Sequence, residues 1–357
     1  MKILPNITSL RFFLAILVVI FHLPEFCSNQ NIPFYNSHPI FHKGTEAVYV
    51  FFSLSGFLII RQLYIEKIKT KTISLKKFFT RRILRIFPLF LLILIFGLIY
   101  YNIILPKFGF PFESNYNIYE GILLSIFFLP NVFAILYKPG GIIEVLWSIG
   151  VEEQFYLFIA PMILFLPSKK IFYFLFLSTI VFLFLYFIET ISLFRRFGMS
   201  FFYFTFSGLI SLITLEKSFL FKNKIISILL SIIFITYFTS NIFLDNLTNE
   251  FYHIFSMVLF SIVLGFLSLT PYKIFENKIL IYLGKISFGI YMYHSIVIQF
   301  IGLIYLKVFK IYSFNNVIII AFYNLLVIII TILISHLSYK YFEIFFINKV
   351  MKTIKNK

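Results

Sequence analysis

The sequence predicts an all-α polytopic membrane protein, and three observations support this class. Hydrophobic residues make up 61% of the 357 residues and charged residues only 13%, whereas a soluble domain is about half apolar and about a quarter charged. The mean hydropathy is +0.97. Apolar runs near the length that crosses a bilayer, about 20 residues, recur along the whole chain. This composition excludes disordered, collagen-like and disulfide-rich classes.

Eleven apolar runs are candidate transmembrane helices, namely 7–23, 45–61, 84–105, 121–137, 150–166, 170–190, 200–215, 224–244, 251–269, 281–306 and 316–347. The run 121–137 is interrupted by Pro130-Asn131 and followed by Pro139-Gly140-Gly141, a pattern typical of a re-entrant or surface segment. We therefore expect about ten transmembrane helices plus this segment. No repeat or linker divides the chain, so residues 1–357 are expected to form a single transmembrane domain.

The net charge of +17 is concentrated in short loops between the apolar runs. This pattern indicates the cytoplasmic loops of a membrane protein and not a nucleic-acid partner. The clusters expected in the cytoplasm are Arg61 to Arg85, Lys169/Lys170, Lys217/Lys222/Lys224, Lys273/Lys278 and the tail from Lys349. We therefore expect a multi-pass protein of the cytoplasmic membrane with both termini in the cytoplasm and lipid around it. Arg195/Arg196 and Lys307/Lys310 fall outside in this topology and count against it.

Arg11 and His22 are ionisable residues inside the first apolar run, and such residues are expensive in a bilayer and mark functional sites by default. They are eleven residues apart, or three helical turns, so they share one helix face about 16 Å apart along the axis. The alternative is that Arg11 extends to the cytoplasmic interface and that His22 is an interfacial residue. Cys27, the only cysteine, follows this run and is expected on the extracytoplasmic side, open to an impermeant maleimide.

Arg82 and Arg85 open the third run, followed by Pro88. At positions i and i+3 of a helix, two guanidinium groups project from one face and form a fork that suits phosphate oxygens. The alternative is that these arginines only anchor the cytoplasmic end of the helix.

Glu152 and Glu153 are adjacent carboxylates that follow the only tryptophan, Trp147. In the expected topology their helix enters from outside, which would bring both to the depth of His22. A histidine and a carboxylate in a wet cavity can activate a hydroxyl. Alternatively, the helix dipole alone stabilises carboxylates at a helix start.

Other polar residues carry less information. Ser55 belongs to a mid-helix group of small residues that would also allow close helix packing. His294 and His336 are expected to be hydrogen-bonded core histidines, and Glu343 can pair with a nearby cation. His38, His42 and His253 are expected in loops. No HExxH, P-loop or dinucleotide fingerprint occurs, and one cysteine excludes a cysteine-based metal cluster, so no metal is expected.

Taken together, these motifs resemble the membrane acyltransferase-3 family, the integral-membrane O-acyltransferases of bacterial surface glycans. The resemblance extends from Ser9 to Glu343. The matching motifs, in family order, are Arg11-x10-His22, Val48-Tyr49-Val50-Phe51-Phe52-Ser53-Leu54-Ser55-Gly56-Phe57, Arg82-x-x-Arg85 with Pro88, Leu146-Trp147-Ser148 with Glu152-Glu153-Gln154-Phe155-Tyr156, Leu283-Gly284-Lys285-Ile286-Ser287 with Tyr291 and His294, and Ser338-Tyr339 with Glu343. The family's final Glu-Arg-Pro is replaced by Glu343-Ile344-Phe345, and the glycine expected before Val-x-Phe-Phe is replaced around Glu46-Ala47.

The resemblance implies transfer of an acyl group, most commonly acetyl, from cytoplasmic acyl-coenzyme A to a hydroxyl of an extracytoplasmic glycan or lipid-linked saccharide. It implies that Arg11, Arg82 and Arg85 hold the donor and that His22 acts as base, assisted by Glu152 or Glu153. Supporting roles are expected for Trp147, Tyr156, Ser55, His294 and Glu343. The extracytoplasmic hydrolase-like domain of some members is expected to be absent.

Two other functions fit intramembrane Arg, His and Glu residues. One is a glycan flippase or proton-coupled transporter, and the other is a structural subunit of a glycan-export machine. Release of free coenzyme A in the presence of acceptor distinguishes the enzyme from both. The sequence does not specify the oligomeric state.

Overall fold

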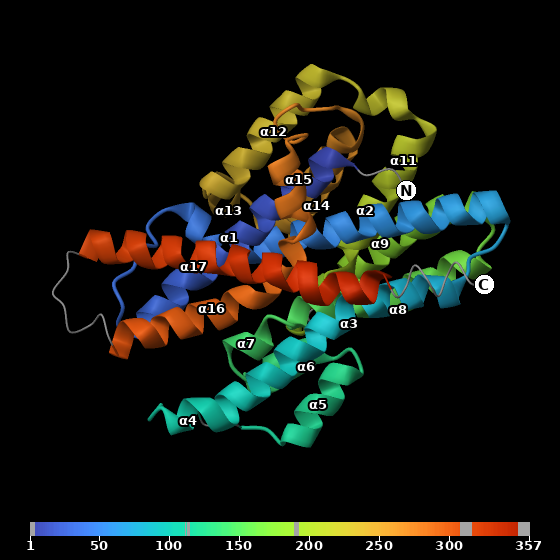
Figure 1. The fold of residues 1–357 in the computed structure, drawn as a ribbon. Helices are drawn as coiled ribbons and strands as arrows, with labels where there is room; N and C mark the ends of the chain where they lie inside the picture. The colour runs from blue at the N-terminus through green and yellow to red at the C-terminus, as the bar shows by residue number, and fades with distance from the viewer. Residues whose placement is uncertain (1–3, 111, 113–114, 189–192, 308–315, 349–357) are drawn as a thin grey trace.

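The protein is an all-helical bundle in the computed structural model, which describes residues 4–110, 112, 115–188, 193–307 and 316–348 (Figure 1). No strand occurs among these residues. The longer helices are α1 (Pro5–Asn29), α2 (Gly44–Thr70), α3 (Leu75–Ile99), α8 (Trp147–Phe165), α9 (Ile171–Phe187), α11 (Phe201–Glu216), α12 (Lys224–Thr239), α14 (Asn249–Leu269), α16 (Ser287–Lys307) and α17 (Asn316–Ser338). The shorter ones are α4 (Leu105–Lys107), α5 (Ile118–Ile126), α6 (Pro130–Tyr137), α7 (Gly141–Glu144), α10 (Leu193–Arg196), α13 (Ile242–Asn246) and α15 (Lys278–Lys285).

Short turns of 3-10 or π-helix extend or connect these helices. They are η1 (Pro39–His42), η2 (Tyr100–Ile104), η3 (Ser168–Lys170), η5 (Ser218–Phe221) and η7 (Tyr339–Glu343). Continuous helical stretches arise where such turns adjoin a helix, as η2 adjoins α3 and η7 adjoins α17. Eight helical segments in the described part of the chain are long and apolar enough to cross a membrane, and α11 and α12 are shorter apolar helices. The all-α polytopic class is thereby confirmed, and the count of ten crossings stays a prediction.

The run 121–137 does not form one membrane-length helix. It is divided between α5 and α6, of nine and eight residues. The chain reverses between them at Phe128, whose φ is +63°, a value that few non-glycine residues adopt. The two helices pack on each other, and α6 packs on α8; Figure 1 shows them at one edge of the bundle with α7. The run therefore has no single membrane-length helix, and its place as a re-entrant or surface segment stays a prediction.

Two buried side chains connect helix ends at one end of the bundle. Asn6 Nδ2 donates a hydrogen bond to the carbonyl of Leu267 at 2.9 Å, so α1 begins where α14 ends. The Lys67 ammonium of α2 donates to the carbonyls of Ile163 (2.6 Å) and Leu164 (2.7 Å) in the last turn of α8. Carbonyls at a helix C-terminus have no partner within the helix, so Lys67 acts as a cap supplied from another helix.

Further contacts bring other helix ends to the same place. Tyr64 of α2 donates to Glu216, the last residue of α11, at 2.8 Å. One cavity is lined by Thr8 near the start of α1 and by Glu343 at the end of η7. The connections that carry the predicted cytoplasmic clusters therefore lie together, and we call this the basic end. Lys310 and the tail from Lys349 lie outside the described residues.

The centre of the bundle depends on close packing of α2 against α11. A Cβ atom on Gly56 would lie 2.1 Å from the carbonyl oxygen of Phe204 in α11, so only glycine fits there. The ring of Phe52, one turn earlier in α2, stacks on Phe204 with centroids 4.7 Å apart. The small residues that the sequence places in mid-helix thus do permit close approach.

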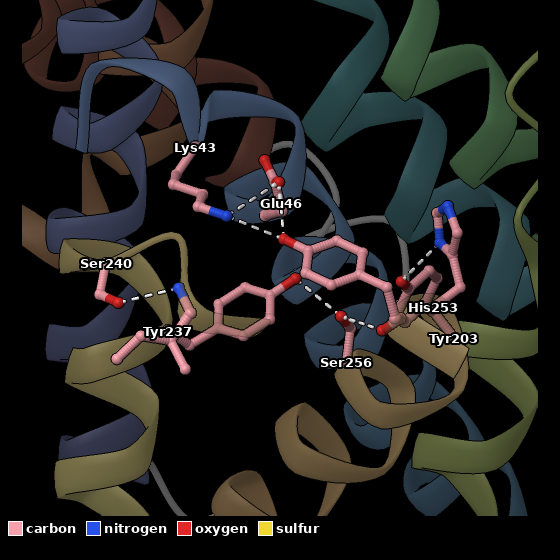
Figure 2. Close-up of polar contacts among 9 residues, drawn as sticks. Lys43, Glu46, Tyr203, Tyr237, Ser240, His253 and Ser256 are labelled. Atoms are coloured by element: carbon pink, nitrogen blue, oxygen red, sulfur yellow. Dashed lines mark hydrogen bonds and ion pairs between the residues drawn. The ribbon is translucent and has the colours of Figure 1, made fainter. Parts of the chain in front are cut away.

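A buried polar network joins α2, α12 and α14 away from the basic end (Figure 2). The Lys43 ammonium, only 2% exposed, donates to the hydroxyl of Tyr252 at 2.9 Å and lies 3.6 Å from Glu46. It also lies 5.2 Å from the ring centre of Tyr237. A buried ammonium requires such compensation because isolated charge is costly to desolvate. The network fixes the start of α2.

Candidate active site

A central cavity of about 100 Å³ lies between α1, α2, α3, α8 and α16. The polar side chains that line it are Arg11, Ser55, Arg82, Arg85, Ser148, Glu152, Tyr156, Ser287 and Tyr291. These residues come from five separate parts of the sequence, and the helix packing brings them together. The cavity therefore contains all three predicted donor-binding arginines and one of the two predicted carboxylates.

Two cavities at the basic end adjoin the central one and share arginines with it. The larger, about 690 Å³, is lined by cationic side chains from α2 and α3, namely Arg61, Lys69, Arg81, Arg82 and Arg85, together with Glu66. The other, about 350 Å³, is lined by Arg11, Arg81 and Arg85 and by Glu343. Arg85 lines all three cavities, and Arg11 and Arg82 each line two of them.

Glu152 is part of this arginine group. Its carboxylate accepts a hydrogen bond from the hydroxyl of Tyr156, one turn later in α8. The Tyr156 hydroxyl also lies 3.0 Å from Ser55 Oγ in α2, and the guanidinium of Arg82 lies over the Tyr156 ring, 5.3 Å from its centre. Glu152 thus shares the central cavity with the arginines, and Tyr156 holds its carboxylate in place.

The central cavity is closed on its far side by Tyr291 of α16. The Tyr291 hydroxyl is 2.7 Å from Ser148 Oγ and donates to the carbonyl of Val145 at 2.9 Å. One helical turn further from the basic end, about 4.5 Å along the axis, α16 carries His294. The cavity therefore ends one turn short of a histidine.

His22 lies against His294, beyond this closure. The centres of the two imidazole rings are 5.2 Å apart. Nδ1 of His22 is 3.5 Å from Oε2 of Glu25, and the His22 side chain is 35% exposed. Because α1 starts at the basic end, His22 lies near the opposite end, and a substrate can approach its exposed side from there.

The structure separates the predicted carboxylates from His22. Glu152 lies with the arginines of the central cavity, and Glu153 is buried with its Oε1 lacking a hydrogen-bond partner among the described residues. The carboxylates near His22 are Glu25 and Glu144. The expected common depth of His22 and Glu152 is therefore wrong, because helical structure already begins at Gly141 in α7.

Sequence reasoning missed Glu25 and Glu144. Glu25 was detectable, because a residue three positions after His22 lies on the same helix face. Glu144 follows the Pro139-Gly140-Gly141 turn, and the Gly140 N–H donates to its Oε1 at 3.1 Å. Its spacing of eight residues before Glu152, slightly over two turns, was the available signal.

The remaining predicted residues are distributed around these cavities. Trp147 lies at the turn into α8, where its ring packs edge-on against Phe52 with centroids 5.9 Å apart. Ser338 donates to Glu343 at 3.2 Å, and Glu343 is buried in the π-turn η7. Nδ1 of His336 lies 2.6 Å from the hydroxyl of Tyr282, so the expected hydrogen bond is present, although His336 is only half-buried.

The expectation that His253 lies in a loop is wrong. It belongs to α14, is 8% exposed, and its Nδ1 lies 3.0 Å from the hydroxyl of Tyr203 (Figure 2). The sequence signal failed because the run 251–269 begins with mixed polar and apolar residues. His253 is part of the polar network around Lys43 and lines none of the three cavities described above.

Comparison with known families shows the family to which this protein belongs. A profile described as "Acyltransferase domain", that of the acyltransferase-3 family, matches residues 4–336. The chain belongs to the acyltransferase-3 family. The resemblance carried by the sequence motifs is thereby confirmed, and this family member is a multi-pass membrane acyltransferase.

Several curated relatives of this acyltransferase-3 member are named as acetyltransferases. It is 30% identical over 316 residues to the putative acetyltransferase ORF330 of Acidianus two-tailed virus, covering 84% of this chain and 85% of the relative. It is 29% identical over 164 residues to the peptidoglycan O-acetyltransferase OatA of Listeria monocytogenes, covering 44% of this chain and 23% of that protein.

A third relative is the O-acetyltransferase OatA of Staphylococcus aureus, which is 29% identical over 175 residues. The match covers 47% of this chain and 26% of that protein. This acyltransferase-3 member thus spans about a quarter of the length of the OatA proteins. No solved structure matches it.

Proposed function

We propose that this protein transfers an acyl group, most commonly acetyl, from acyl-coenzyme A bound at the basic end to a hydroxyl of a glycan or lipid-linked saccharide at the opposite end. One observation carries the proposal. The cationic cavity, the arginine-lined central cavity and the His22–His294 pair follow one another from the basic end to the opposite end. The groups suited to bind phosphate thus lie nearer the basic end, and the proposed base lies nearer the opposite end.

The cationic cavity suits the nucleotide part of the donor. Coenzyme A carries a diphosphate and a further phosphate, and guanidinium groups bind phosphate oxygens in bidentate fashion. Five Arg or Lys side chains line this cavity. The central cavity is much smaller, about 100 Å³, and suits the thin arm that ends in the thioester.

The reaction requires one proton transfer at the acceptor end. The acceptor oxygen forms an ester bond to the acyl carbon while the carbon–sulfur bond of the thioester breaks. Neutral His22 takes up the hydroxyl proton. The leaving thiolate takes up one proton to become the thiol of coenzyme A, and His22 returns to its neutral form by releasing one. A positioned base of this kind contributes about 10²–10⁴-fold to a rate.

Consumption of thioester tests the proposed reaction directly. Purified protein in lipid, supplied with acetyl-coenzyme A and a surface-glycan fraction, should release free thiol in amounts that match an acetyl mass increase on the glycan. A transporter or structural subunit would move or hold the glycan without releasing thiol. Thiol release without modification of any hydroxyl would also contradict the proposal.

The orientation of the protein is part of this proposal, with the basic end in the cytoplasm. Cys27 cannot report it, contrary to the sequence-based expectation, because it is buried with 2% exposure. We expect an impermeant maleimide to label Ser37→Cys in intact cells and Thr72→Cys only after permeabilisation, since both positions are exposed, one at each end. Native protein should stay unlabelled in both conditions. The reverse pattern would overturn the orientation.

A further inference from the structure

The side chain of Tyr291 lies between the central cavity and the two histidines. Tyr291 lines the cavity, and its ring centre is 5.8 Å from that of His294, which is itself 5.2 Å from that of His22. Neither histidine lines the central cavity or the two cavities at the basic end. A thioester in the central cavity is therefore separated from an acceptor at His22 by the Tyr291 side chain, which is only 6% exposed.

Two hydrogen bonds hold the Tyr291 hydroxyl in this position, and their directions are fixed. The hydroxyl has one hydrogen, which it donates to the carbonyl oxygen of Val145 at 2.9 Å. A carbonyl oxygen can only accept a hydrogen bond. The bond of 2.7 Å between the hydroxyls of Tyr291 and Ser148 is therefore donated by Ser148. Both bonds fasten α16 to the same short stretch of chain at the start of α8.

This stretch needs a partner from outside its own helix. The α-helical structure is interrupted at Val145 and Leu146, because α7 ends at Glu144 and α8 begins at Trp147. Carbonyls at a helix end lack a partner within the helix, and Val145 is only 4% exposed. Displacement of Tyr291 would take the donor away from this buried carbonyl, which costs free energy. The closed position of Tyr291 is therefore the stable one.

We propose that Tyr291 is a gate that shields the donor thioester from water at the His22 end, so that coenzyme A is released only when an ester is formed. This inference rests on the proposed function and adds control of access to it. If water replaced the acceptor, its oxygen would bond to the acyl carbon while the carbon–sulfur bond broke. The products would be acetate, the thiol of coenzyme A and one proton. Closure of a site commonly serves to exclude this side reaction.

The ratio of thiol released to ester formed tests the inference. Tyr291→Phe keeps the ring but removes both hydrogen bonds, so thiol release without acceptor should rise about 10-fold and the ratio with acceptor should exceed that of wild type. Ser148→Ala removes one of the two bonds and should give a smaller rise. If Tyr291→Phe does not accumulate in membranes, Ser148→Ala makes the same comparison. A merely structural role predicts instead that thiol and ester fall together at an unchanged ratio.

Tyr323→Phe is the matched control. It also removes a buried hydroxyl that donates to a backbone carbonyl, that of Ile298 at 2.9 Å, and Tyr323 lines none of the three cavities. It should keep the wild-type ratio. An equal rise in Tyr323→Phe would show that loosened packing admits the water, and would overturn the gate.

The inference and the proposed function fail in different ways. If Tyr291→Phe keeps the wild-type ratio while wild-type protein forms ester and thiol in matching amounts, only the gate is overturned. If wild-type protein supplied with donor and acceptor releases no thiol, the proposed function fails instead.

Discussion

Replacement of His22 by alanine should lower acyl transfer by about 10²–10⁴-fold, the usual contribution of a positioned general base. The neutral ring must accept the acceptor proton, and alanine offers no atom that can do so. The His22 side chain is 35% exposed at the end of the bundle opposite the arginines, so its loss should leave donor binding intact.

Two measurements separate catalysis from folding in this variant. Membrane insertion and binding of acyl-coenzyme A should match wild type, and steady-state transfer should show the loss in the turnover number. His38→Ala is the control, because His38 lies in an exposed turn and lines none of the three cavities. This replacement should leave both donor binding and turnover unchanged. A properly inserted His22→Ala protein with wild-type turnover would leave His22 as an interfacial residue.

Replacement of both Arg82 and Arg85 by alanine should have the second large effect, at the donor end. Each hydrogen bond to a charged group contributes about 1.5–3 kcal/mol, so loss of the pair should lower kcat/KM for the acyl donor by roughly 10²–10⁴-fold, mainly through a higher KM. Both side chains line the central and the cationic cavities. Lysine at these positions should restore only part of the loss, because it lacks the bidentate fork.

Arg196→Ala is the control for this pair, since Arg196 is exposed in α10 and lines none of the three cavities. It should leave the KM for the donor unchanged. Full rescue of the double variant by lysine would show that Arg82 and Arg85 only anchor the helix at the cytoplasmic surface, and the donor site would have to lie elsewhere.

The sequence predicts the single-helix features of the site well. Arg11 and His22 share a helix, so their spacing in turns places one in the central cavity and the other near the opposite end, as the structure shows. Arg82 and Arg85 both line the central cavity for the same reason, and their role in binding phosphate stays a prediction. These predictions succeed because helical geometry alone fixes the positions of residues within one helix.

Features that depend on packing between helices could not be predicted. The depth of Glu152 depends on where helical structure starts, and it starts at Gly141 in α7, nine residues before the predicted apolar run 150–166. The approach of His294 to His22 joins residues 272 positions apart and is set by the packing of α16 on α1. No periodicity within either helix encodes it.

Sided transfer in sealed proteoliposomes tests the central claim most directly. The protein is reconstituted so that its basic end faces the vesicle interior, which contains acetyl-coenzyme A labelled in the acetyl group. Acceptor glycan is supplied only outside, at the opposite end of the protein. We predict labelled ester on the external glycan, loss of this label in the His22→Ala and Arg82→Ala/Arg85→Ala proteins, and intact vesicles throughout. Transfer that requires donor and acceptor on the same side would contradict the account.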